Sequence, residues 1–310
     1  MLNATYLMFM IFFFISLVSP VFSFHSAKKN GFNQFNTLKK PSIKMSLGGL
    51  ELGAGTLITG LILDNTISKN SLDILVSKNS KLLYEGYKKS IINLLVIGPI
   101  LYSFVTMNKW NPTNSIDAID SVGLELDKML GLVLIHSIGY YISHYSMHNF
   151  NFLKKYHQFH HKFRNPLITS IANSVSKPEF ILAYMLPFVA GAYILNPNQD
   201  TFNSAICVVS FFNLIIHCNE LTESKAISKI NFDYKKVFFL WDSNFIVSPD
   251  KHFSHHNGTE IEKGSDGLDS IQSRTYSAPT FNIDFLIEKS FDFKFYLDSL
   301  IIQLLVFLRP

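Results

Sequence analysis

Five histidines fall within eighteen residues in the stretch "HYSMHNFNFLKKYHQFHH" at 144–161, although the whole chain of 310 residues has only eleven. The segment "HFSHH" at 252–256 repeats the spacing of "HQFHH" at 157–161, and His217 stands alone between them. On a helix, residues i and i+4 lie on the same side and residue i+3 is their neighbour. Each segment is therefore expected to project its histidines together, as one multidentate group of metal ligands.

Neutral imidazole is a ligand that suits iron, zinc, copper and nickel. A single zinc site uses three or four protein ligands, so nine convergent imidazoles are too many for one ion and suit two. Iron is the expected metal, because it changes oxidation state and activates O₂, which zinc cannot do. The candidate ligands are His144, His148, His157, His160, His161, His217, His252, His255 and His256.

The composition indicates that membrane-embedded helices position these residues. Mean hydropathy is +0.20 and only 16% of the residues are charged, which is typical of membrane proteins. The net charge of +4 is too small to indicate a nucleic-acid partner. Apolar segments lie at 91–107, 128–147, 178–196 and 203–217, with a weaker one at 50–64 and a short one at 298–308. We expect an all-α integral membrane bundle with the histidine-lined site at one membrane face.

The order of the apolar segments decides where the histidines lie relative to the membrane. The polar loop "NPNQDT" at 196–201 turns one helix back toward the next, so two crossings separate His161 from His217. All nine histidines can therefore lie at one face. Basic residues gather beside them, whereas the 196–201 loop has none. By the positive-inside rule, the histidine face is expected to be cytosolic or stromal. The flanking basic residues are Lys154, Lys155, Lys162, Arg164, Lys235, Lys236 and Lys251.

The N-terminal fifty residues differ from the rest of the chain. Residues 1–24 are mostly apolar, like a signal peptide or a signal anchor, and residues 25–50 contain lysines but no acid. The second part is typical of a transit peptide, and a disordered basic leader is the alternative. The endoplasmic reticulum and a plastid membrane both remain possible locations. Residues 51–310 are expected to form the membrane domain, with the histidine segments in a core at 128–290.

The order HX3H, HX2HH, a lone histidine after a membrane hairpin, then HX2HH resembles the fatty acid hydroxylase and sterol desaturase superfamily of integral membrane di-iron enzymes. The stretches "SKPEF" at 176–180 and "YSAPTFNIDFLI" at 276–287 are also similar to that superfamily. The resemblance implies hydroxylation or desaturation of a sterol, fatty acyl or sphingoid lipid, with O₂ as oxidant. It implies the nine histidines above as ligands of a di-iron centre of two iron ions.

Such a reaction needs two electrons from a carrier. The glycine-containing stretches "GGLELGAG" and "GPI" lack the context of a nucleotide-binding motif. A separate electron donor is therefore expected to dock on the basic histidine face, a cytochrome b5-type protein in the endoplasmic reticulum or a ferredoxin in a plastid.

Two other functions remain open from the residues alone. A membrane metal-dependent hydrolase would need HEXXH, but Tyr145 follows His144 and the motif occurs nowhere in the chain. A non-catalytic metal-binding membrane protein would hold its ligands within broken helices at the bilayer midplane, whereas most of these histidines lie in polar segments.

Metal-bound histidines usually donate the other ring N–H to an acceptor, and several residues near the histidine segments could fill that role. His136, in the segment at 128–147, is either such a neighbour or an ordinary interior histidine. The other candidates are Tyr140, Tyr141, Glu179, Glu220 and Asp250.

Overall fold

The structure is a computed structural model that describes residues 47–109, 124–221, 245–257 and 276–289. Residues 1–46 of the predicted leader and the apolar segment at 298–308 lie outside these residues, whereas residues 47–50 of the leader belong to α2. Every element in the described part is helical, which confirms the predicted all-α fold. The elements are α2 (Leu47–Thr66), α3 (Lys69–Ile92), η1 (Asn93–Ile97), α4 (Gly98–Lys109), α5 (Leu126–Asn149), α6 (Asn151–His157), η2 (His160–Lys162), η3 (Thr169–Asn173), α7 (Lys177–Glu179), η4 (Phe180–Met185), α8 (Leu186–Leu195), α9 (Gln199–Ile216), η5 (Asn219–Leu221), α13 (Pro249–Asn257) and α14 (Ile283–Lys289).

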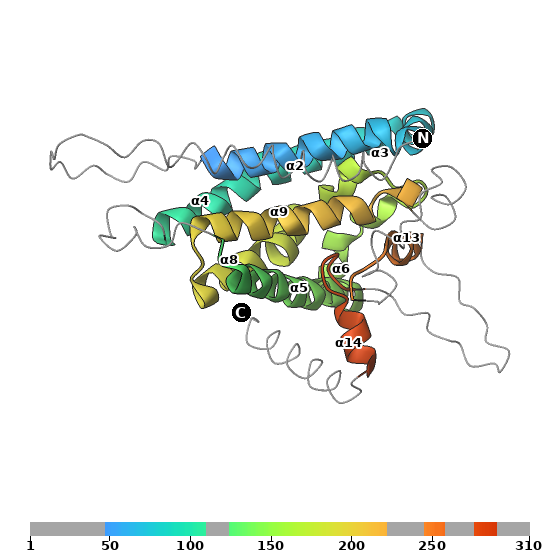
Figure 1. Ribbon diagram of the computed structural model, residues 1–310. Helices are drawn as coiled ribbons and strands as arrows, with labels where there is room; N and C mark the ends of the chain where they lie inside the picture. The colour runs from blue at the N-terminus through green and yellow to red at the C-terminus, as the bar shows by residue number, and fades with distance from the viewer. Residues whose placement is uncertain (1–46, 110–123, 222–244, 258–275, 290–310) are drawn as a thin grey trace, which may run out of the picture.

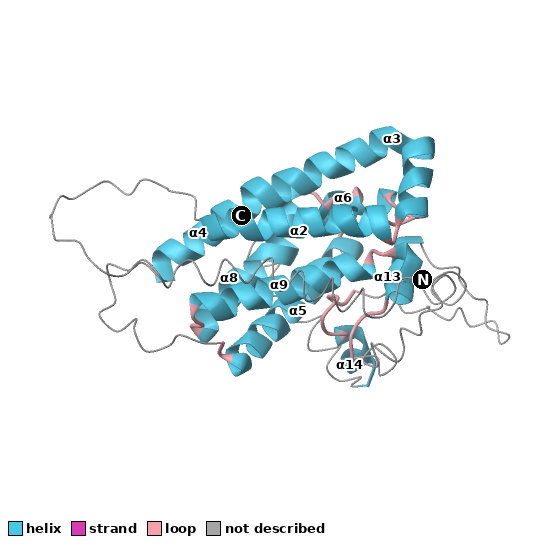
Figure 2. Cartoon of the chain, turned by 45° about the horizontal axis from the view of Figure 1, so that its top comes forward, coloured by secondary structure: helices cyan, strands magenta, loops and turns pink. Residues whose placement is uncertain are grey.

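The long helices run side by side along one direction, and the short helices α6, α13 and α14 lie toward one end of the bundle (Figures 1 and 2). Helix α5 packs against both α8 and α9, and α2 packs against α4 and α9. The core between them is apolar and includes Leu132 of α5, Phe188 of α8 and Phe202 of α9. The bundle therefore has an apolar interior between its long helices, and the short helices lie at one end of it.

Three helical stretches in the described part are long and apolar enough to cross a membrane: Lys69–Asn108, Lys177–Leu195 and Gln199–Ile216. The first is longer than the predicted segment at 91–107, because α3, η1 and α4 follow one another directly. Asn79, with φ of −153° and ψ of 55°, kinks α3 within this stretch. The predicted crossing at 128–147 lies in α5, which is not among the three. Polar side chains on its buried face, including His136 and Ser137, lower its mean hydropathy.

The outer face of α5 is nevertheless apolar. Leu130, Leu134 and Ile138 recur every four residues and are all exposed, so they form one stripe along the helix. An exposed apolar stripe beside a polar buried face is the pattern expected of a helix that faces lipid on one side and a polar site on the other.

The predicted hairpin between the second pair of apolar segments is present. Helix α8 ends at Leu195, and Asn196 takes a left-handed conformation with φ of 46°. The side chain of Asn198 then accepts a hydrogen bond from the backbone N–H of Thr201 at 2.8 Å, which caps the start of α9. The loop residues themselves therefore direct α9 back along α8 toward the histidine end.

Gly53 makes a close helix contact that can be tested. A Cβ atom at Gly53 would lie 1.9 Å from the backbone oxygen of Leu94, whereas one at Gly55 would meet nothing within 4 Å. Gly53→Ala should therefore force α2 away from η1 and lower stability by about 1–3 kcal/mol. Gly55→Ala, in the same helix, should be neutral or raise stability by up to about 1 kcal/mol. Thermal unfolding of both variants in detergent checks this, and equal melting temperatures would contradict the close contact.

The predicted topology also has a direct test. Single cysteines would replace the exposed residues Lys155 and Ser254, or Asp200 beside the hairpin loop, in a background without Cys207 and Cys218. In sealed vesicles, a membrane-impermeant thiol reagent should label the first two positions from one side and Cys at position 200 only from the other. Labelling of positions 155 and 254 from opposite sides would exclude a shared site at one face.

Candidate metal centre

The nine predicted histidines converge into two adjacent groups. One group contains five imidazoles and the other four, and within each group the candidate ligand atoms lie within 4.8 Å of one another. Seven of the nine side chains are buried, and His148 and His161 are partly exposed. The first group is His144, His148, His157, His161 and His255, and the second is His160, His217, His252 and His256.

The expectation that each segment acts as one ligand group holds for His144 and His148, which lie in the same group, but is wrong for the segments 157–161 and 252–256. His157 and His161 lie in the five-histidine group, while His160 between them lies in the four-histidine group. The segment at 252–256 does the reverse, because its pair His252 and His256 joins the four-histidine group and His255 joins the other. Successive residues of a helix are about 100° apart, whereas residues four apart differ by only about 40°. Adjacent histidines therefore point to different groups.

The local structure of these segments also differs. His144 and His148 lie near the end of α5, and all three histidines of 252–256 lie on α13. In the segment 157–161, only His157 lies on an α-helix, because α6 ends there and His160 and His161 lie in the 3₁₀ turn η2. The lone His217 directly follows α9 as its C-cap residue. The hairpin thus returns the chain to the same end, where His217 joins the four-histidine group.

Four of the rings are held by their outer nitrogen, Nδ1. His157 Nδ1–H donates to Glu179 Oε1 at 2.6 Å, and both side chains are almost fully buried. Three others donate to backbone carbonyl oxygens: His144 to Tyr276 at 3.0 Å, His217 to Asn213 at 2.7 Å and His256 to Phe163 at 2.8 Å. These bonds fix the orientation of each ring and leave its Nε2 atom facing the group.

Only one of the acids proposed from the sequence contacts a histidine ring in this way. Glu220 instead accepts a hydrogen bond from the hydroxyl of Ser71 at 2.8 Å. Tyr140 touches His144 through its ring, edge to face with centroids 5.2 Å apart, and Tyr141 packs against Tyr276. Asp250 lies in the first turn of α13.

The carbonyl partners could not be identified from residue types, because every residue has a carbonyl group. Tyr276 was marked only by its place in the stretch "YSAPTFNIDFLI", which resembles the superfamily. In the structure this stretch closes over α5, and Ser137 and Thr280 lie within hydrogen-bonding distance, with their hydroxyl oxygens 2.9 Å apart. The C-terminal stretch is therefore part of the site.

The tautomers that these bonds impose leave a set of lone pairs facing one another. A carbonyl oxygen can only accept, so Nδ1 of His144, His217 and His256 carries the hydrogen, and in a neutral ring Nε2 then carries a lone pair. His144 Nε2 lies 3.0 Å from Nε2 of His157, whose Nδ1 is bonded to Glu179, so two lone pairs face each other there. It also lies 3.1 Å from Nε2 of His255, and in the other group His252 Nε2 lies 2.9 Å from Nε2 of His217 and 3.1 Å from that of His256. A cation among these atoms would accept the lone pairs and remove the repulsion between His144 and His157, so the residues fit a metal ion in each group.

Burial keeps the imidazoles in the form that binds metal. Desolvation and the neighbouring imidazoles hold the pKa values of His157, His160, His252, His255 and His256 well below the usual value for histidine. These rings are therefore neutral at physiological pH, and a neutral ring can donate a lone pair to a metal.

The five-histidine group opens to the outside of the bundle through a polar pocket. His148 and His161 line it together with the basic side chains Lys154, Lys162 and Arg164. Three of the seven basic residues predicted beside the histidines thus line the mouth of the site, whereas Lys155 and Lys251 do not line it. Lys235 and Lys236 lie outside the described residues.

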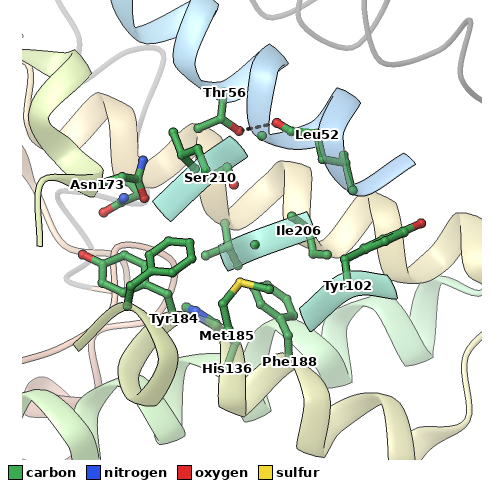
Figure 3. Close-up of a pocket in the computed structure, with 17 residues that line it drawn as sticks. Leu52, Thr56, Tyr102, His136, Asn173, Tyr184, Met185, Phe188, Ile206 and Ser210 are labelled. Atoms are coloured by element: carbon green, nitrogen blue, oxygen red, sulfur yellow. Dashed lines mark hydrogen bonds between the residues drawn. The ribbon is translucent and has the colours of Figure 1, made fainter. Parts of the chain in front are cut away.

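A second, apolar cavity of about 70 Å³ lies between α2, α4, α5, α8 and α9 (Figure 3). Leu52, Ile206 and Phe188 contribute to its walls, and His136 lines it as well. His136 belongs to neither histidine group, and its ring packs against Phe188 with centroids 4.4 Å apart. Of the two interpretations of His136, the structure supports an interior histidine beside a cavity.

Comparison with known proteins identifies a family for the part of the chain that holds most of the site. Residues 129–266 match the family model of fatty acid hydroxylases, and this range contains all nine candidate ligands. No curated protein and no solved structure matches the chain. Over residues 129–266, the predicted membership of the fatty acid hydroxylase and sterol desaturase superfamily is confirmed.

Proposed function

We propose that this protein is an O₂-dependent di-iron oxidoreductase that hydroxylates or desaturates a lipid of the sterol, fatty acyl or sphingoid type. The observation that carries the proposal is the pair of buried imidazole groups, whose Nε2 atoms face one another within the range that matches fatty acid hydroxylases. The matched family supports a lipid hydroxylase or desaturase type of oxidoreductase, and the candidate membrane spans support an enzyme that meets its substrate in the bilayer.

The nine histidines would hold the metals, one ion in each group. Two bound irons would supply the reduction of O₂ and the oxidising power needed to break an unactivated C–H bond. The chain supplies the rest. Glu179 and three backbone carbonyl groups orient the rings, and burial of the four-histidine group limits the access of water to that part of the reacting centre.

The apolar cavity lies close enough to the histidines to hold the lipid. Asn213 lines the cavity, and its backbone carbonyl oxygen is the acceptor for His217. Tyr140 contacts the ring of His144 on one side and that of His136 on the other. A lipid segment in the cavity would therefore lie beside Asn213, one helical turn from His217, and beside His136, about two turns from His144.

The basic mouth of the five-histidine group suits an acidic electron donor, since Lys154, Lys162 and Arg164 surround the opening. The donor would be a cytochrome b5-type protein in the endoplasmic reticulum or a ferredoxin in a plastid membrane. The histidine face would then be cytosolic or stromal, and residues 1–24 and 25–50 would form the leader that directs residues 51–310 to the membrane.

The proposed reaction is tested with ¹⁸O₂. The iron-loaded protein in lipid vesicles would receive ¹⁸O₂ and a chemical or protein reductant, and the lipids would be analysed by mass spectrometry. A new hydroxyl group with the label identifies a hydroxylase, and a new unlabelled double bond that requires O₂ identifies a desaturase. Metal analysis separates the alternatives, since one tightly bound zinc would favour a hydrolase and loosely held mixed metals a binding protein. No O₂-dependent change across a broad lipid panel with iron loaded would overturn the proposal.

A further inference from the structure

The apolar cavity contains polar atoms that the fold leaves without partners. Neither ring nitrogen of His136 makes a hydrogen bond, and the same is true of the hydroxyl of Tyr184 and the side-chain oxygen Oδ1 of Asn213. The exposed fractions of these residues are 1%, 7% and 3%. All three residues line the same cavity, and Figure 3 shows Tyr184 and His136 on neighbouring parts of its wall. Three different helical elements, α5, η4 and α9, thus bring unpaired polar groups to one small space.

Buried polar groups without partners are costly, and folded proteins normally satisfy them. The backbone of Tyr184 is the polar neighbour of the His136 ring, and the Tyr140 side chain is the polar neighbour of the Tyr184 hydroxyl. Even with these partners, one ring nitrogen of His136 and one hydrogen-bonding position of the Tyr184 hydroxyl remain unpaired. Tyr102, on the wall of the same cavity, has a hydroxyl that is hydrogen-bonded as a buried polar group normally is. Its hydroxyl donates to Asn203 Oδ1 at 2.7 Å and accepts from Gln199 Nε2 at 3.0 Å. The unpaired groups are therefore confined to the part of the wall formed by His136, Tyr184 and Asn213.

This part of the wall is also the part nearest the metal centre. Asn213 lies one helical turn before His217 and holds that ring through its backbone carbonyl. Tyr140 bridges His136 and His144, with ring centroids 6.1 Å and 5.2 Å away, and its ring also packs edge to face on Tyr184 at 5.3 Å. A group held by these three side chains would have a defined position relative to both histidine groups.

We propose that His136, Tyr184 and Asn213 bind a hydroxyl group of the lipid substrate, and so select lipids whose buried part carries a hydroxyl. The inference rests on the proposed function and deepens it by naming a substrate class. A hydroxyl group both donates and accepts hydrogen bonds, so it can donate to Asn213 Oδ1, which a carbonyl group cannot do, and accept from Tyr184 or His136. A hydrocarbon chain end would leave all three unpaired. The site therefore favours a hydroxylated lipid, such as a sterol or a sphingoid base, over the methyl end of a plain acyl chain.

The rival occupant is ordered water, which could satisfy the same groups without any lipid selectivity. The test compares lipids that differ only in the hydroxyl: 1-octadecanol with octadecane, and 5α-cholestan-3β-ol with 5α-cholestane. The full-length, metal-loaded protein in detergent would receive equal mole fractions of each pair and be purified again. Mass spectrometry would then give the amount of each lipid retained per protein.

We expect the wild-type protein to retain the hydroxylated member of at least one pair about tenfold more strongly than its hydrocarbon, the effect of one buried hydrogen bond. Tyr184→Phe, which removes only the hydroxyl, and His136→Phe should bring that ratio close to one. Tyr102→Phe is the matched control in the same cavity and should keep the ratio, although it leaves Asn203 without its donor and should lower the melting temperature. Tyr184→Phe removes a hydroxyl whose polar neighbour is the Tyr140 side chain, and it should lower the melting temperature less than Tyr102→Phe does.

Equal retention of both members of both pairs by the wild-type protein would overturn the inference in favour of water. A wild-type preference that persists in Tyr184→Phe and His136→Phe would overturn it as well, because the selectivity would then arise elsewhere. The assay needs no turnover. Selective binding without O₂-dependent chemistry would therefore count against the proposed reaction alone. Turnover with unselective binding would count against the hydroxyl site alone.

Discussion

His252→Ala is expected to remove one of the two metals and abolish turnover. His252 belongs to the four-histidine group, and its Nε2 atom lies 2.9 Å from that of His217 and 3.1 Å from that of His256. Three imidazoles of the group would remain, but the ring that contacts both His217 and His256 would be lost. The five-histidine group shares no ligand with this one, so its ion should stay bound. Iron content should therefore fall from two ions per chain to one.

The effect on turnover should exceed the roughly 10–100-fold loss that mutation of an outer partner of a metal ligand causes, because the proposed reaction would need both irons. His148→Ala should be milder for metal binding, since that ring is partly exposed and four imidazoles of its group remain. Elemental analysis of the purified variants and the ¹⁸O₂ assay give the two measurements. His136→Ala is the control, because His136 lies outside both groups and should leave two irons bound. Retention of two irons and normal turnover by His252→Ala would remove His252 from the set of ligands.

Replacement of Glu179 is expected to weaken metal binding without removing any ligand. The carboxylate accepts the Nδ1–H bond of His157 at 2.6 Å in a nearly dry environment, and it thereby fixes the ring and makes Nε2 a better donor. Glu179→Ala removes the acceptor and should lower iron affinity or turnover about 10–100-fold. Glu179→Gln keeps a neutral acceptor oxygen and should fall between Glu179→Ala and the wild-type protein.

Glu220 offers a matched control for this change. It is also a buried glutamate, and it lies three residues after His217, but its carboxylate bonds to Ser71 rather than to a histidine. Glu220→Gln should therefore keep iron affinity, whatever it does to thermal stability. The rate of iron loss to a chelator separates a role at the metal from a general loss of folding. Equal chelation rates for Glu179→Ala and Glu220→Gln would contradict the role assigned to Glu179.

Much of the architecture could be predicted because it depends on local properties of the chain. The hairpin at 196–201 is formed by residues that suit its geometry: Asn196 takes the left-handed conformation and Asn198 caps the next helix. The membrane-spanning stretches were less accurately predicted. The first stretch extends far beyond 91–107, because the helix includes the charged and polar residues of α3. Helix α5 has a polar buried face and an apolar outer stripe, and its mean hydropathy is the average of the two.

The sequence by itself determined which side chains could ligate metal and that they would lie at one end of the bundle. Repeated histidine spacing, apolar segments and turn residues can all be read directly from the sequence. Only the tertiary structure decided which histidine joins which group, because adjacent histidines diverge by about 100° and their destination depends on where α6, α13 and the end of α9 meet. It also decided that Glu179 rather than Glu220 holds a ligand, and that carbonyl groups of Phe163, Asn213 and Tyr276 hold three others. Most of these contacts join residues far apart in the chain. Every residue has a backbone carbonyl group, so the sequence cannot indicate which carbonyl groups bind a histidine.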